Sequence, residues 1–191
     1  MRYHIDMNSN MMIWLERLTT LHKSQMRKAA NAEGMPFVHL EILQYLSICN
    51  HYSNTAQALS DYLGQTKGSI SQSLKIIEDK GYIIRKPCIQ DGRVTRLYLT
   101  EKSKDILERI QHLIFPDQDA EQVVASLKKI VKQWHIQTGS SGFGQCLTCR
   151  FWTVVDEGNF KCGLTGEPLS KENIKLLCQE HEFPEECSPN G

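Results

Sequence analysis

The first 137 residues carry apolar side chains at helical spacing, and this pattern predicts six helices. Met11, Leu15 and Leu18 mark the first of them. The helices are expected over residues 9–30, 36–49, 55–63, 67–80, 100–114 and 119–135. Asn54 and Thr66 have side chains suited to capping the third and fourth helices, and a glycine follows each of these helices.

Between the fourth and fifth helices, the pattern changes to that of a β-hairpin. Residues 82–87 and 94–99 are expected to form two strands, and Gln90-Asp91-Gly92-Arg93 between them is typical of a hairpin turn. A helix, a short helix, a third helix and then a hairpin form a helix-turn-helix followed by a wing. The predicted fold class is therefore mainly α with a small β-hairpin (α+β).

The helix over residues 67–80 has the two faces that a DNA recognition helix needs. Ile70, Leu74 and Ile77 form a stripe directed at a core, while the opposite side carries small or hydrogen-bonding groups that can approach base edges in a major groove. An arginine on a protruding hairpin can enter a narrow, electronegative minor groove. The candidate DNA contacts are Lys67, Ser69, Ser71, Gln72 and Lys75 on the helix, with Arg93 and Arg96 on the hairpin.

Charge is distributed unevenly in a chain that is neutral as a whole, with 22 Lys and Arg against 22 Asp and Glu. Residues 67–104 contain nine basic and four acidic residues, a local net charge of +5, which suits contact with a polyanion. The alternative for this stretch is an ordinary solvated surface. Hydrophobic residues make up 40% of the chain and charged residues 23%, which indicates a folded protein.

Residues 37–106 resemble the MarR family of bacterial winged-helix transcription regulators. The resemblance lies in Lys80-Gly81-Tyr82-Ile83-Ile84-Arg85, in Asp91-Gly92-Arg93 and in Leu97-Tyr98-Leu99-Thr100. The chain departs from the family at Gln72, where an Arg is common, and at Ser103, where a Gly is common. The resemblance implies a homodimer, joined through N-terminal and C-terminal helices, that binds a roughly palindromic operator in double-stranded DNA and responds to a small-molecule effector.

Two of the predicted helices carry apolar stripes that a winged helix does not need. They cover residues 9–30 and 119–135. Stripes left over after a small core is filled commonly mark an oligomer interface, which supports a homodimer independently of the resemblance. The alternative is that the two stripes pack against each other within one chain.

Five of the seven cysteines lie in the last 46 residues, after a Gly- and Ser-rich stretch typical of a flexible linker. The expected domains are a winged-helix and dimerisation domain over residues 1–137, a linker over 138–145 and a Cys-rich module over 146–191. Cys146 and Cys149 form a Cys-x-x-Cys pair, and Cys162 and Cys178 follow singly. Such a pair can grip one metal, and a module this small needs the stability that a metal supplies.

Three interpretations of these cysteines stay open. A 4Fe–4S cluster on Cys146, Cys149, Cys162 and Cys178 is preferred, because the spacing resembles that of high-potential iron–sulfur proteins and aromatic residues flank the thiols. Zinc is the second, bound by the same four cysteines or with His181 replacing one of them. The third is no metal, with reduced thiols or with disulfides, which cytosolic conditions disfavour.

The function expected from these features is transcription regulation through DNA binding, controlled by a metal or redox centre or by a small ligand. The competing class is a metal-dependent or thiol enzyme that uses its winged helix for protein contacts. The sequence has no Gly-rich phosphate loop, no His-Glu-x-x-His motif and no nucleophile elbow, so an enzyme is not expected. No apolar run has the length of a membrane span and the start lacks a signal-peptide layout, so we expect a cytoplasmic protein without a membrane partner.

Overall fold

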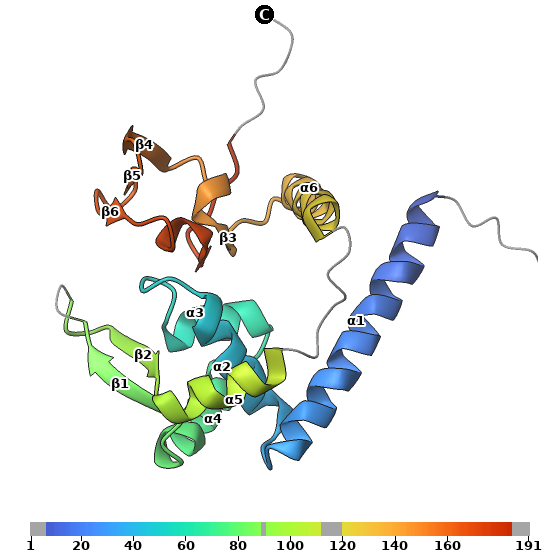
Figure 1. Ribbon diagram of the computed structural model, residues 1–191, viewed down its shortest axis with the longest axis vertical. Helices are drawn as coiled ribbons and strands as arrows, with labels where there is room; N and C mark the ends of the chain where they lie inside the picture. Colours follow the sequence, from blue (N-terminus) through green and yellow to red (C-terminus); the bar gives the residue numbers. More distant parts are fainter. Residues whose placement is uncertain (1–6, 89–90, 112–119, 185–191) are drawn as a thin grey trace, which may run out of the picture.

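The computed structural model describes residues 7–88, 91–111 and 120–184, and its elements follow the predicted order (Figure 1). The first part contains α1 (Met7–Ala32), α2 (Phe37–Ile48), α3 (Ala56–Leu63), α4 (Lys67–Asp79), β1 (Ile83–Pro87), β2 (Thr95–Leu99) and α5 (Glu101–Gln111). The second contains α6 (Ala120–Thr138), β3 (Gly144–Gln145), η1 (Cys146–Thr148), β4 (Trp152–Asp156), β5 (Asn159–Cys162), β6 (Pro168–Leu169), η2 (Asn173–Lys175) and β7 (Leu177–Cys178). Gln90, at the start of the predicted hairpin turn, and the predicted helix ends at residues 112–114 and 119 lie outside the described residues.

The predicted fold class is confirmed, since the described chain is mainly helical and β1 and β2 pair as an antiparallel wing. The predicted stripe of α4 is completely buried, with Ile70, Leu74 and Ile77 at 0% exposure. Thr66 caps α4 as predicted, because its hydroxyl oxygen accepts a hydrogen bond from the Ser69 N–H at 3.2 Å. The local pattern therefore places the helix-turn-helix correctly.

The prediction that Asn54 caps α3 is wrong. Thr55 caps this helix instead, accepting a hydrogen bond from the Ala58 N–H at 3.1 Å. Asn54 is buried, and its side-chain amide donates to the Leu97 carbonyl at 3.0 Å, while the Leu97 N–H donates to the Asn54 carbonyl at 2.8 Å. Asn54 thus ties the loop between α2 and α3 to β2 of the wing.

A single hydrophobic core joins α2 to the helices and the wing around it. Leu40, Leu43 and Leu59 have no exposed surface, and burying a side chain of this size contributes about 1.5–3 kcal/mol. Tyr45 is also buried, and its hydroxyl donates to the Ser53 carbonyl at 2.9 Å. This hydrogen bond fixes the end of α2 to the loop that follows it.

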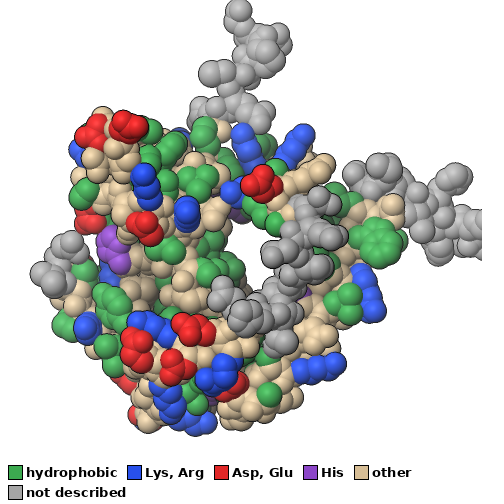
Figure 2. Space-filling view, in the orientation of Figure 1, with side chains coloured by type: hydrophobic (Ala, Val, Ile, Leu, Met, Phe, Trp, Pro, Cys, Tyr) green, Lys and Arg blue, Asp and Glu red, His purple; other side chains and the backbone are tan. Residues whose placement is uncertain are grey.

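The apolar stripes of α1 and α6 remain uncovered within one chain. Trp14 of α1 is 66% exposed and Trp134 of α6 is 55% exposed, and no residue of α6 is buried. Figure 2 shows hydrophobic side chains at the surface of the N-terminal half of α1, at the right of the molecule. Among the described residues, no helix has both the length and the apolar character needed to cross a membrane.

The Cys-rich segment, taken as residues 139–184, packs on the loop between α2 and α3 (Figure 1). The Asn50 N–H donates to the Leu177 carbonyl at 2.8 Å, and the Gln179 N–H donates to the Ser53 hydroxyl oxygen, also at 2.8 Å. The ring of Phe143 packs against two tyrosines of the helix-turn-helix. The segment is therefore held by direct contacts as well as by the chain that joins it to α6.

Candidate nucleic-acid interface and cysteine-lined cavity

The solvent face of α4 presents all five of the helix residues predicted to contact DNA. Each of them is exposed, while Ser73 on the same helix is buried. Ser69 donates a hydrogen bond from its hydroxyl to the Gln65 side-chain oxygen at 3.2 Å, next to the helix N-terminus. The five residues are Lys67, Ser69, Ser71, Gln72 and Lys75. This face combines positive charge with donors and acceptors of hydrogen bonds, which is what phosphates and base edges require.

The wing tip presents Arg93 to solvent. The Asp91 carbonyl accepts a hydrogen bond from the Val94 N–H at 2.9 Å and so closes the turn. The Asp91 carboxylate accepts from the Arg93 N–H at 3.0 Å and from its Nε at 3.1 Å, and these hydrogen bonds lower the pKa of the carboxyl group. The Arg93 side chain is nevertheless 92% exposed. Asp91 therefore orients a guanidinium that remains accessible to a polyanion.

Arg96 differs from the other predicted DNA contacts because it faces the body of the protein. Its Nη1 donates to the Tyr52 carbonyl at 2.6 Å, and the side chain is only half-exposed. Arg96 also lines a cavity between the winged helix and the Cys-rich segment. The structure thus gives this arginine a partner inside the protein.

The four predicted metal-binding cysteines line this same cavity, which has a volume of about 170 Å³. They come from η1, from the residue after η1, from the end of β5 and from β7, in the order Cys146, Cys149, Cys162 and Cys178. The Cys149 N–H donates to the Cys146 carbonyl at 2.9 Å, so a tight turn brings this pair to one side of the cavity. The structure thus brings together four thiols that are spread over 33 residues of sequence.

Polar groups around Cys178 favour its thiolate. The pKa of Cys178 is lowered to about 6, mainly because the Cys146 thiol donates a hydrogen bond to it, with further contributions from Asn50, the Glu180 N–H and Ser53. The same contact and burial raise the pKa of Cys146. Asn50 donates from Nδ2 to the Cys146 sulfur at 3.9 Å. Donors from the winged helix therefore reach the sulfur atoms of the segment.

Sequence reasoning missed Asn50 and Tyr52, which complete the cavity wall from the winged-helix side. Neither residue lies on a periodic stripe. The only signal is a polar stretch over residues 50–54 that follows an apolar helix. Such a stretch is ordinary for a loop, so its contact with cysteines about 100 residues further along the chain could not be read from it.

His181, the alternative metal ligand, lies apart from the cavity. It has no exposed surface, its Nε2 is 2.9 Å from the Thr148 hydroxyl oxygen, and its ring packs edge-on against Phe183. Burial lowers its pKa. Within the described residues, no group of three or more His, Cys, Asp or Glu side chains is placed to hold a single metal ion.

Gly144 makes room for the buried His181 ring, and this contact yields a stability prediction. A Cβ on Gly144 would lie 2.5 Å from two ring atoms of His181, which is closer than packing allows. Gly144→Ala is therefore expected to lower the free energy of unfolding by about 1–3 kcal/mol, measured by urea denaturation. Gly68→Ala is the control, because a Cβ there meets nothing within 4 Å. Equal stability of the two variants would contradict the tight packing around His181.

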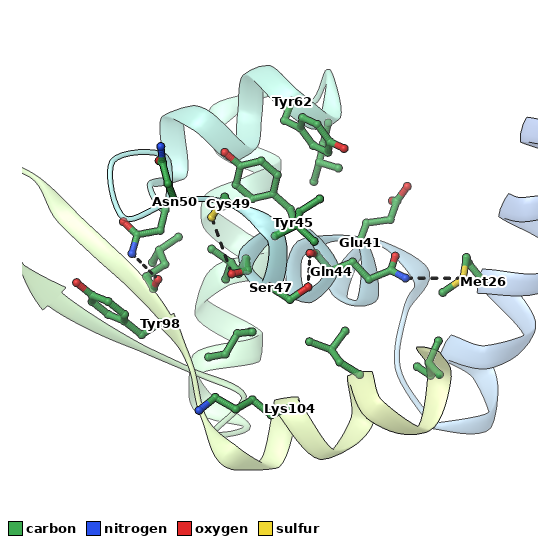
Figure 3. A pocket seen from close by; sticks show the side chains of 18 of the residues that line it. Met26, Glu41, Gln44, Tyr45, Ser47, Cys49, Asn50, Tyr62, Tyr98 and Lys104 are labelled. Carbon is green, nitrogen blue, oxygen red and sulfur yellow. Dashed lines mark hydrogen bonds between the residues drawn. The ribbon is translucent and has the colours of Figure 1, made fainter. Parts of the chain in front are cut away.

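A larger cleft of about 1070 Å³ lies between α1, α2, α5 and β2. Figure 3 shows Gln44 extending from α2 toward Met26 of α1, where its amide donates to the Met26 sulfur at 3.7 Å. Glu41 lies on the same wall, and burial raises the pKa of its carboxyl group. The cleft thus has largely apolar walls and contains the carboxyl group of Glu41, which is partly buried.

Comparison with known proteins relates this winged helix to a family of regulators. A sequence model of the MarR family matches residues 33–94, from the end of α1 to the wing turn. None of the curated proteins matches the sequence. Members of the MarR family are transcription regulators and not enzymes, which favours the first of the two function classes considered.

Solved structures of three regulators superpose on the chain. A MarR family regulator from Silicibacter pomeroyi is 18% identical, with a TM-score of 0.54 over 68% of this chain and 92% of the regulator. BldR from Sulfolobus solfataricus is 16% identical, with a TM-score of 0.53 over 69% and 99%. A MarR regulator from Methanosarcina mazei Go1 is 21% identical, with a TM-score of 0.50 over 66% and 97%. The chain therefore has the winged-helix fold of the MarR regulators.

Proposed function

We propose that the protein is a cytoplasmic transcription regulator that binds operator DNA as a homodimer. The observation that carries this proposal is the exposed polar face of α4 beside a wing that presents Arg93 at its tip. The match of residues 33–94 to the MarR family supports the same function. The Silicibacter pomeroyi structure with this fold is described as a transcriptional regulator.

In the proposed complex, α4 lies in a major groove and the wing reaches the adjacent minor groove. Gln72 is placed to read an adenine edge through its amide, while Lys67 and Lys75 contact phosphates. Arg93 enters the minor groove, where a narrow groove concentrates negative potential. The proposed DNA surface omits Arg96, because that side chain is bound to the Tyr52 carbonyl.

The homodimer would form through the uncovered stripes of α1 and α6. Leu18 and Leu21 of α1 are 42% and 45% exposed, and Leu127 and Val131 of α6 are 40% and 42% exposed. Covering such stripes removes apolar surface from water, which is the main driving force of obligate association. Two copies of α4 would then face successive major grooves, about 34 Å apart along the duplex.

The cleft between α1, α2 and α5 is the proposed site of a small-molecule effector. Its volume of about 1070 Å³ exceeds the space that a drug-sized molecule needs. It touches both α1, which carries the dimer surface, and β2 of the wing. A ligand bound there would shift the spacing of the two recognition helices if it binds one spacing more tightly than another.

The wing contact can be tested with Arg93→Ala. We expect this change to weaken binding of a duplex, selected by the wild-type protein from a random pool, by about 5–150-fold, equivalent to about 1–3 kcal/mol. The free energy of unfolding should be unchanged, because the side chain is 92% exposed. Fluorescence anisotropy over a range of salt concentrations measures both the affinity and the number of phosphate contacts.

Lys171→Ala provides the matched control, since it removes an exposed positive charge from the Cys-rich segment. Its duplex affinity should equal that of the wild type. If Arg93→Ala binds as tightly as this control, the wing takes no part in DNA binding. If the wild-type protein selects no duplex from the pool, the proposed function itself is wrong.

A further inference from the structure

The cavity that the four cysteines line, together with other side chains, has more room than a single ion needs. A single zinc requires all four sulfur atoms about 2.3 Å from one point, which leaves no room between them. Here, Cys146, Cys149, Cys162 and Cys178 line a cavity of about 170 Å³. A 4Fe–4S cluster fills a space of this kind, because each thiolate binds a different iron on the outside of a cubic core.

The charge and hydrogen-bond donors of the cavity wall suit an anionic centre. A 4Fe–4S core in its oxidised form, held by four thiolates, is a dianion, and the cationic residue Arg96 lines the cavity. Asn50 already donates to the Cys146 sulfur at 3.9 Å. Trp152 also lines the cavity, and its buried indole N–H has no partner among the described residues. Donors to sulfur of this kind stabilise a cluster and tune its reduction potential.

The Cys-rich segment needs an additional source of stability. Among the described residues from 139 to 184, only Cys146, Leu169 and His181 have buried side chains. A hydrophobic core this small cannot hold a segment of this length, and a bound metal centre commonly supplies the missing free energy. The cavity lies where the segment meets the winged helix, so a centre there would join the two.

The winged-helix side of the cavity is connected directly to the wing. Arg96 belongs to β2 and lines the cavity, and its Nη1 donates a hydrogen bond to the Tyr52 carbonyl in the loop between α2 and α3. In the same loop, Asn54 pairs with Leu97, the next residue of β2. A change in the position of Arg96 at the cavity would therefore alter the hydrogen bonds that hold the α2–α3 loop against β2 of the wing.

We propose that the four cysteines bind a 4Fe–4S cluster, and that the bound cluster holds the α2–α3 loop and the wing in the arrangement that binds DNA. When a preformed cluster held by four carrier thiolates binds, four new iron–sulfur bonds form to the cysteines and the four bonds to the carrier thiolates break. The protons of the four cysteine thiols pass to the departing thiolates, which leave as free thiols. No electron is transferred in this step. The assignment of the cluster site does not depend on the proposed function. The control of DNA binding by the cluster rests on the proposed function.

The first experiment measures metal in the full chain purified without oxygen. We expect about four irons and four acid-labile sulfides per chain, and a broad absorption band that bleaches in air. Colourless protein with about one zinc per chain would overturn the cluster. Protein that contains neither metal would overturn it as well.

Cys162→Ser and Cys88→Ser form a matched pair for the ligand assignment. Cys162 lines the cavity, whereas Cys88 lies beside the wing outside it. Cys162→Ser should lose most of its iron, and Cys88→Ser should keep about four irons per chain. Circular dichroism reports whether each variant is folded, and the metal content of the wild type does not depend on that outcome. A folded Cys162→Ser chain with full iron content would overturn the assignment.

The second experiment compares the duplex affinity of the wild-type protein with and without its cluster, which is removed anaerobically with a chelator and an oxidant. We expect removal to weaken binding by about 5–150-fold, the usual range of coupling between two sites. Equal affinity of both forms would overturn the control by the cluster. Protein that contains the cluster but binds no duplex in either form would overturn the proposed function and leave the cluster site supported.

Discussion

A chain that carries both Val131→Glu and Trp134→Glu is expected to be a folded monomer with at least ~100-fold weaker affinity for a full operator than the wild-type dimer. Both side chains are exposed in the single chain, at 42% and 55%, so a charge there does not disturb the core of the protomer. In a dimer the same positions would be buried, and two carboxylates without partners would cost several kcal/mol. The monomer then loses the affinity gained when two linked sites bind together.

Light scattering after size-exclusion chromatography measures the mass, and circular dichroism checks that the protomer is folded. Lys129→Glu together with Gln133→Glu is the control, because these residues are exposed on the opposite face of α6 and change the net charge by −3, one more than the −2 of the test variant. The control should remain dimeric. A dimeric Val131→Glu, Trp134→Glu chain would show that the α6 stripe lies outside the interface.

The sequence predicts those parts of the fold that depend on neighbouring residues. The stripe of Ile70, Leu74 and Ile77 and the cap at Thr66 can both be read from spacings of three and four residues. The wing turn follows from Asp91 and Gly92 in the same way. Each of these features is decided within one helical turn or one hairpin, where local preferences dominate.

Contacts between distant segments could not be predicted in this way. The Asn50 amide reaches the Cys146 sulfur across 96 positions, and the Gln179 N–H reaches the Ser53 hydroxyl across 126. Arg96 follows the wing tip in the sequence, and this position gave no sign of its hydrogen bond to a carbonyl 44 positions away. The cysteine spacing indicated that a shared site exists, but the winged-helix half of its wall is a product of tertiary packing.

Asn50 is the residue whose loss should most weaken the contact between the winged helix and the Cys-rich segment. It is 5% exposed, and its Oδ1 accepts hydrogen bonds from the Ser53 N–H at 3.0 Å and from the Ser53 hydroxyl at 2.8 Å. Its own N–H donates to the Leu177 carbonyl at 2.8 Å, and its amide donates to Cys146. One side chain therefore shapes the loop and reaches the cavity at the same time.

Asn50→Ala is expected to lower the free energy of unfolding by about 2–3 kcal/mol, because it removes an acceptor from the completely buried Ser53 hydroxyl and a donor from the Cys146 sulfur. Urea denaturation measures the loss, and hydrogen exchange should show faster exchange at Gln179, whose N–H binds Ser53. Ser47→Ala, at an exposed position near the end of α2, should change stability by less than about 0.5 kcal/mol. Asn50→Asp retains the acceptor oxygen and loses the amide donor, so it should preserve the loop but not the contact with Cys146. If Asn50→Ala were as stable as Ser47→Ala, the loop would not depend on this side chain, and the Cys-rich segment would have to be held by other contacts.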